Sequence, residues 1–149
     1  MNQPLGVTTE INLHTPVLLP DSYCGDIHER LVLYKRFANC SNSDELDDLH
    51  AELVDRFGLL PEPAQALLES HRLRLLAKPL GIAKLDASTE AVSIQFVPNP
   101  PINPARIIEL IQTRRNFKLA GQDKLRVTVA APTLANRVEN IRKLFKELS

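Results

Sequence analysis

"ELVDRFGLLPEPA", residues 52–64, is the junction at which one helix ends and the next begins. Gly58 follows a periodic apolar pattern and fits the position after a helix where a left-handed backbone is favoured. Pro61 and Pro63 suit the first turn of a new helix, because that turn leaves its N–H groups unpaired anyway. The stretch therefore predicts two consecutive helices joined by a short turn.

Two helices are predicted on the N-terminal side of this junction. The nearer one starts at Ser43, a good N-cap, and places four apolar residues on one side: Leu46, Leu49, Leu53 and Phe57. The farther one covers 26–38, and its apolar positions recur at helical spacing: Ile27, Leu31, Tyr34 and Ala38. We expect these two stripes to form the buried faces of the two helices.

Strands dominate the predictions outside the helical stretch. Strands are expected in 9–14, 82–87 and 91–97, and a hairpin in 116–130. Two more helices are expected as well. One opens at Asn103 and Pro104, and the closing one buries a stripe formed by Leu134, Val138, Ile141, Phe145 and Leu148. Residues 1–8 are interpreted as a linker or an expression remnant, and 9–149 as the domain. The prediction is an α+β fold, a single compact domain in which helical hairpins pack with a small, mostly antiparallel sheet.

Composition and motifs argue against catalysis by this chain. The five glycines are solitary, the four histidines form no zinc or H-E-x-x-H pattern, and Cys24 and Cys40 are isolated. We therefore predict no catalytic residue, no cofactor and no metal site. No apolar run is long enough to span a bilayer, and the two isolated cysteines are typical of reduced thiols, so we expect a cytoplasmic protein without a membrane partner.

Charge is balanced overall but divided along the chain. Residues 1–75 hold 12 acids and 6 Lys or Arg, and residues 76–149 hold 6 acids and 12 Lys or Arg. Such polarity suits a charged protein partner. Zero net charge argues against a dedicated nucleic-acid binder, so we expect no direct nucleic-acid binding.

The predicted helix before Gly58 carries an acidic stripe opposite its leucines: Asp44, Asp48, Glu52 and Asp55. Six acids and no Lys or Arg lie between residues 41 and 55. Carboxylates near a helix C-terminus are mildly unfavourable, which makes Glu52 and Asp55 unusual. One interpretation is an ordinary solvated face. The other is a docking surface for arginines of another domain, because Arg grips carboxylates bidentately.

Four segments resemble one family in the same order: "INLHTPVLLPD" (11–21), "RLVLYKRFA" (30–38), "ELVDRFGLLPEPA" (52–64) and "PLGIAKL" (79–85). From about Thr9 onward the chain is similar to the C-terminal domain of bacterial transcription-repair coupling factors. Pro79 departs from the polar helical residue expected before Leu80, and we expect it to end its helix a turn early.

The resemblance implies a regulatory domain of a larger protein. The whole protein would be an ATP-driven DNA translocase that displaces stalled RNA polymerase and recruits the excision-repair protein UvrA. This domain would pack on a UvrB-like N-terminal module of the same protein, mask the UvrA surface and restrain the motor. We assign its partner interface to Asp48, Glu52 and Asp55. The alternative is a DNA-contacting accessory domain that uses the basic C-terminal half.

Overall fold

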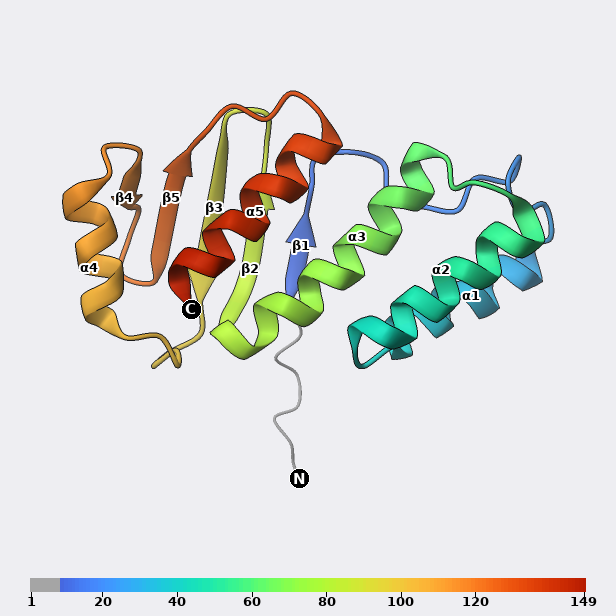
Figure 1. Ribbon diagram of the computed structural model, residues 1–149, viewed down its shortest axis with the longest axis horizontal. Coiled ribbons are helices and arrows are strands. Elements are labelled where there is room, and N and C mark those ends of the chain that lie inside the picture. Colours follow the sequence, from blue (N-terminus) through green and yellow to red (C-terminus); the bar gives the residue numbers. More distant parts are fainter. Residues whose placement is uncertain (1–8) are drawn as a thin grey trace. The chain divides into compact units, whose positions relative to one another are not determined.

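The computed structural model describes residues 9–149, and the predicted linker 1–8 lies outside the described residues. The described chain is of the α+β class, with five α-helices, one short 3₁₀ helix and a five-stranded mixed sheet (Figure 1). Its contacts cluster in two compact units. One comprises the described residues up to His14 together with Leu76–Ser149, and the other is Thr15–Leu75.

The first unit, called the sheet unit here, contains the strands in the order β1-β2-β3-β5-β4. Their bounds are β1 Glu10–Asn12, β2 Ile82–Ala87, β3 Ala91–Phe96, β4 Phe117–Leu119 and β5 Lys124–Thr128. β1 pairs with β2 in parallel, and every other pairing is antiparallel. A parallel pair needs a long crossover, and the whole helical unit lies within that crossover.

Helices of the sheet unit cover one face and one edge of the sheet. α5, Leu134–Leu148, crosses the face that carries the buried residues Val92, Leu125 and Val127 (Figure 1). α4, Pro104–Thr113, lies beside β4 at the outer edge and shields an edge strand that would otherwise be open to pairing (Figure 1). The sheet therefore has one covered face and one face that α4 and α5 leave open.

A buried arginine joins α5 to the end of β1. Arg137 is 7% exposed and donates to the carbonyl oxygens of Ala131 and Leu13 at 3.0 and 2.9 Å. A buried guanidinium must have hydrogen-bond partners, and these carbonyls supply them. Thr9 fixes the other end of β1 by donating from its hydroxyl to the carbonyl of Ile82 at 2.8 Å.

The second unit, called the helical unit here, contains α1 Ile27–Asn39, α2 Ser43–Phe57 and most of α3 Glu62–Ala77. Its core comprises Leu19, Cys24, Leu33, Phe37, Cys40, Leu46, Leu49, Leu53, Leu60, Ala64, Leu67 and Leu68. Gly58 ends α2 with a φ of 94°, in the conformation that favours glycine. α3 ends at Ala77, and a 3₁₀ turn, η1 Lys78–Leu80, follows with Pro79 inside it.

Most sequence predictions of the fold are confirmed. The α+β class, the mostly antiparallel sheet, the strands at 82–87 and 91–96 and the β4–β5 hairpin are all present. Asn103 caps α4 with Pro104 in its first turn. The cap of α2 is one residue earlier than predicted, because the side chain of Asn42 and not of Ser43 accepts from Glu45 N at 2.9 Å.

The predicted buried face of α1 is wrong. Ile27 and Leu31 are 66% and 59% exposed, and the residues that α1 buries are Leu33 and Phe37. α1 is apolar on more than one side, so two stripes with helical spacing overlap in its sequence. Periodicity identifies the helix here, but packing on the core decides which stripe is buried.

Candidate functional site: the acidic face of α2

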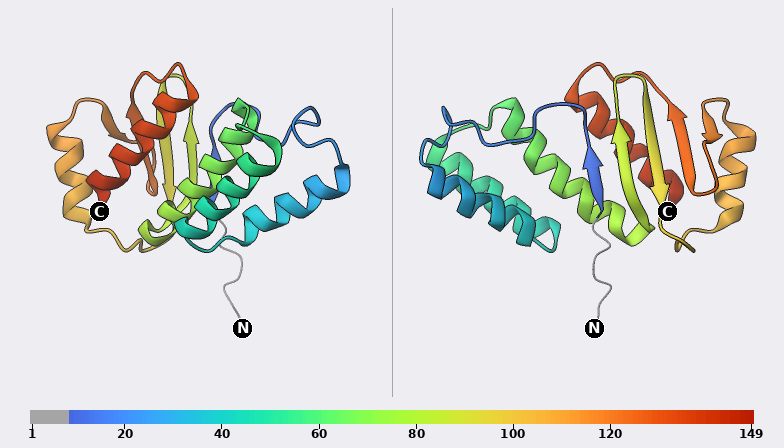
Figure 2. Two further views of the ribbon diagram at one scale, coloured as in Figure 1. Left: turned by 45° about the vertical axis from the view of Figure 1, so that its right-hand side comes forward. Right: turned by 180° about the vertical axis from the view of Figure 1, so that it is seen from behind.

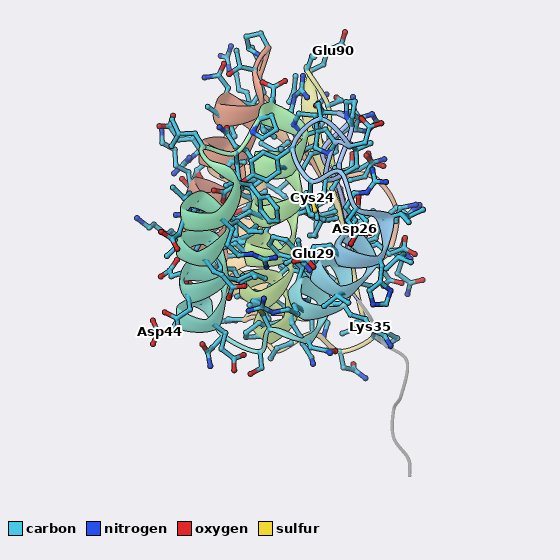
Figure 3. All side chains as sticks on the ribbon, turned by 90° about the vertical axis from the view of Figure 1, so that its right-hand side faces the viewer. Cys24, Asp26, Glu29, Lys35, Asp44 and Glu90 are labelled. Atoms are coloured by element: carbon cyan, nitrogen blue, oxygen red, sulfur yellow. The ribbon has the colours of Figure 1, made fainter. Side chains whose placement is uncertain are left out.

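The outer face of α2 carries three carboxylates in a row, which we call the acidic ridge: Asp44, Asp48 and Asp55. At about 100° per residue they lie opposite the buried Leu46, Leu49 and Leu53. All three acids are exposed, and Figure 3 shows Asp44 pointing away from α1. Within the described part of the chain, none of the three side chains forms an ion pair. The ridge is therefore open to cations from outside the described chain.

Glu52 is turned toward α1 and differs from the ridge in its surroundings. Arg36 of α1 donates two hydrogen bonds to its carboxylate, at 2.6 and 2.7 Å. Arg56 contacts it from one turn along α2, at 3.3 Å. The bidentate bond from Arg36 is the main reason that the pKa of Glu52 is lowered to about 2.

The ion-pair network continues from Glu52 across the two helices. Arg56 also pairs with Glu29 of α1, and Figure 3 shows Glu29 on the side of α1 that faces α2. Glu52 therefore differs from the other acids of the predicted stripe, because its basic partners lie within this chain. The helical hairpin brings Arg36 close to Glu52 from 16 residues away, a proximity that spacing within α2 does not reveal.

The unfavourable position of Asp55 at the end of α2 is partly explained by the neighbouring Arg56. Asp55 lies in the last turn, where partial negative charge makes a carboxylate unfavourable. Arg56 lies in the same turn and offsets that charge. Within residues 9–149, Asp55 itself forms no ion pair.

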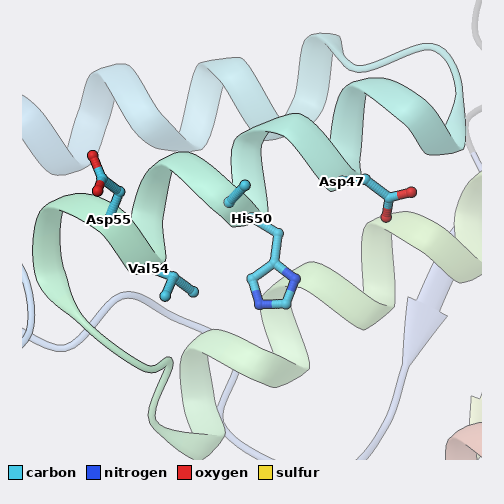
Figure 4. Close-up of a pocket in the computed structure, with 5 residues that line it drawn as sticks. Asp47, His50, Val54 and Asp55 are labelled. Atoms are coloured by element: carbon cyan, nitrogen blue, oxygen red, sulfur yellow. The ribbon is translucent and has the colours of Figure 1, made fainter.

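A shallow hollow lies beside the ridge, on the side of α2 that faces α3. It is lined by His50, Ala51, Val54 and, at its two ends, Asp47 and Asp55 (Figure 4). Asp47 is already paired with Arg72 at 2.9 Å. The hollow thus combines an apolar floor with one unpaired carboxylate, Asp55. Sequence reasoning missed it, although the small Ala51 between two acidic turns was a usable signal.

The chemistry that the site offers is that of exposed carboxylates beside an apolar hollow. Within residues 9–149, no group of three or more His, Cys, Asp or Glu side chains is placed to hold a metal ion. In the same residues, no helix is long and apolar enough to cross a membrane. Chemically, the acidic face can bind cationic side chains and admit a small apolar one beside them.

The fold and the surface together define an α+β module with an acidic helical face. The model of the TRCF domain family matches residues 13–107 of the chain. The chain belongs to this family.

Curated relatives are transcription-repair-coupling factors from several bacteria. The chain is 39% identical to the one from Escherichia coli over 141 residues, which cover 94% of this chain and 12% of that protein. It is 47% identical to the one from Haemophilus influenzae over 103 residues, covering 69% of this chain and 9% of that protein. The chain thus spans about a tenth of the length of these relatives.

A solved structure supports the fold. The crystal structure of a transcription-repair coupling factor C-terminal domain superimposes with a TM-score of 0.77, covering 95% of this chain and 91% of that one. Sequence identity in this comparison is 21%. The similarity therefore establishes the shared α+β fold.

Proposed function

We propose that residues 9–149 form a cytoplasmic autoinhibitory domain of a transcription-repair coupling factor and dock on a UvrB-like N-terminal module of the same protein. Docking would mask the surface needed by UvrA and restrain an ATP-driven DNA translocase. The parent protein would displace stalled RNA polymerase and recruit excision repair. The domain itself would act without catalysis.

The observation that carries this proposal is the acidic ridge beside the hollow of α2. Asp48 and Asp55 are exposed carboxylates without an ion pair in the described chain, and Ala51 and Val54 lie between them. Arginines on the partner would meet the carboxylates, and an apolar side chain would fill the hollow. Glu52, the third residue assigned to the interface, would act from its place in the Arg36 network by keeping α1 and α2 together.

A contact of this kind suits a reversible switch. An interface made of exposed charges and a shallow hollow is polar and moderate in size, as is typical between domains that separate. Release would be a shift of population from a closed to an open arrangement, with UvrA selecting the open one.

The test uses this domain, the isolated N-terminal module and the full-length protein. The double substitution Asp48→Lys, Asp55→Lys should weaken docking at least tenfold and raise UvrA binding by the full-length protein. The wild-type affinity should fall as salt rises, because the contact is between charges. Unchanged docking and unchanged UvrA binding would overturn the interface assignment.

Two controls separate docking from folding. Glu90→Lys makes the same charge change as either single substitution, in the exposed β2–β3 turn, and should leave docking unchanged. Asp55→Lys should keep or slightly raise thermal stability, since a cation is favoured at a helix C-terminus. Loss of docking in a variant that is no less stable would indicate a residue used for binding.

A further inference from the structure

The open face of the sheet carries a basic cluster formed by Lys118 of β4 and by Lys124 and Arg126 of β5. Strand register places Lys118 directly opposite Arg126. Lys124 lies two residues before Arg126 and so points to the same face. All three residues are exposed. The view from behind in Figure 2 shows this face of the sheet uncovered by α5.

Neutral hydrogen-bonding side chains surround the cluster. Arg126 pairs in register with Ser93 of β3, and Lys124 with Gln95. Thr128 lies two residues beyond Arg126, and Asn116 donates from its amide to the Thr128 carbonyl at 3.2 Å. The acids of this face, Glu10 and Asp86, lie at its other side, on β1 and β2. The β4–β5 half is therefore a cationic surface rich in donors.

The basic cluster destabilises the folded sheet unless an anion binds to it. Like charges directly opposite each other on neighbouring strands destabilise a sheet. Among residues 9–149, no acid pairs with Lys118, Lys124 or Arg126, and Arg126 reaches only toward the hydroxyl of Ser93, at 3.5 Å. Lysine on an edge strand often prevents unwanted pairing, but Arg126 lies on β5, which is paired on both sides. An external anion would remove the repulsion.

We infer that this basic cluster binds the phosphate backbone of duplex DNA without sequence preference. Among the described residues of this face there is no aromatic side chain on which bases could stack, which disfavours single-strand recognition. Three cations on two neighbouring strands, with hydroxyl and amide donors beside them, match a row of phosphates. The sequence predicted no direct binding because net charge averages this cluster with the acids of the helical unit. The inference uses the sheet unit and does not depend on the proposed docking of α2.

The binding test is a fluorescence anisotropy titration of the whole chain against two duplexes of unrelated sequence. Both should bind equally at 20 mM salt, with a Kd on the order of 10⁻⁴ M or tighter. The slope of log K against log salt should be about −3, as expected for three neutralised phosphates. Absence of binding at 20 mM salt, or binding to poly-glutamate in preference to DNA, would overturn the inference.

A charge-reversing variant should change DNA affinity and thermal stability in opposite directions. Arg126→Glu should lower DNA affinity at least tenfold and at the same time raise the melting temperature, because the new carboxylate faces Lys118. Lys146→Glu, a matched exposed change on α5 at the covered side of the sheet, should reduce affinity less than twofold. Equal losses in the two variants, or loss of affinity only with loss of stability in Arg126→Glu, would contradict the assignment.

Discussion

Glu52 illustrates how a single side chain is used within the molecule. The fork from Arg36 and the contact from Arg56 make it the centre of the α1–α2 ion-pair network. Its carboxyl pKa in the folded protein, about 2, is lower than in the unfolded chain. The folded state is therefore favoured by this group above the unfolded pKa, and that contribution is lost as the pH falls from about 4.5 toward 2.

Glu52→Gln should lower the free energy of unfolding at pH 7 by about 0.5–1 kcal/mol, a modest value because the pair is partly exposed. The difference from wild type should shrink as the pH falls through this window. Urea unfolding at pH 7 and at pH 3 measures both values. Asp48→Asn is the control on the same helix, and it should leave the free energy of unfolding unchanged at pH 7 and at pH 3. A Glu52→Gln effect that is independent of pH would contradict the ion-pair account.

His71 provides a second titration at the residue scale. Its ring stacks on Phe37, with ring centroids 5.6 Å apart, and Arg74 contacts its Nδ1 at 3.2 Å. Burial, with a smaller effect of the Arg74 charge, lowers the pKa of His71 to about 4. The unfolded chain binds a proton near pH 6.5, before the folded protein does, so stability should fall as the pH drops from 6.5 to 4.

The expected loss from His71 over that window is about 1–2 kcal/mol, discounted for the partial exposure of the ring. His71→Gln keeps a neutral polar side chain beside Arg74 and should flatten the pH dependence between 6.5 and 5. Chemical denaturation of both proteins at half-unit steps of pH measures this. Identical slopes for wild type and variant would show that His71 does not titrate as the structure indicates.

At the scale of elements, helix ends and strands were predictable, and helix faces were less so. Caps and prolines act through local backbone chemistry, which is why Gly58 and the Asn103–Pro104 start were correctly assigned. The buried face of α1 depends on contacts with residues far away in the sequence. The same limit applies to the site. The acids of α2 were visible in the sequence, but the ion pair between Arg36 and Glu52 forms only when α1 and α2 pack together.

The two faces of α1 yield a matched prediction. Leu33→Ala removes a fully buried side chain (1% exposed) and should cost about 2–5 kcal/mol. Leu31→Ala removes the same atoms from a side chain that is 59% exposed and should change stability by no more than about 0.5 kcal/mol. Denaturant midpoints of the two variants measure the difference. Comparable losses would mean that the stripe predicted from the sequence is buried after all.

At the scale of the whole molecule, charge divides between the two units nearly as it divides between the two halves of the sequence. The helical unit holds 11 acids and 6 Lys or Arg, and the sheet unit holds 7 acids and 12 Lys or Arg. Each unit therefore presents one of the two proposed binding surfaces, an acidic one for arginines and a basic one for phosphates. The units also differ in connectivity, because the helical unit is one continuous segment and the sheet unit is not.

Because the helical unit is one uninterrupted segment of the chain, we predict that it folds without the sheet unit. Residues 15–75 contain their own core of twelve buried side chains, although a segment of about 60 residues is expected to be only marginally stable. The isolated segment should show helical circular dichroism and a cooperative thermal transition, and Leu33→Ala should abolish that transition. A non-cooperative melt of the unsubstituted segment would show that its core needs the sheet unit. The complementary deletion of 15–75 should not preserve β1 in the sheet, because a tight turn cannot connect the parallel strands β1 and β2.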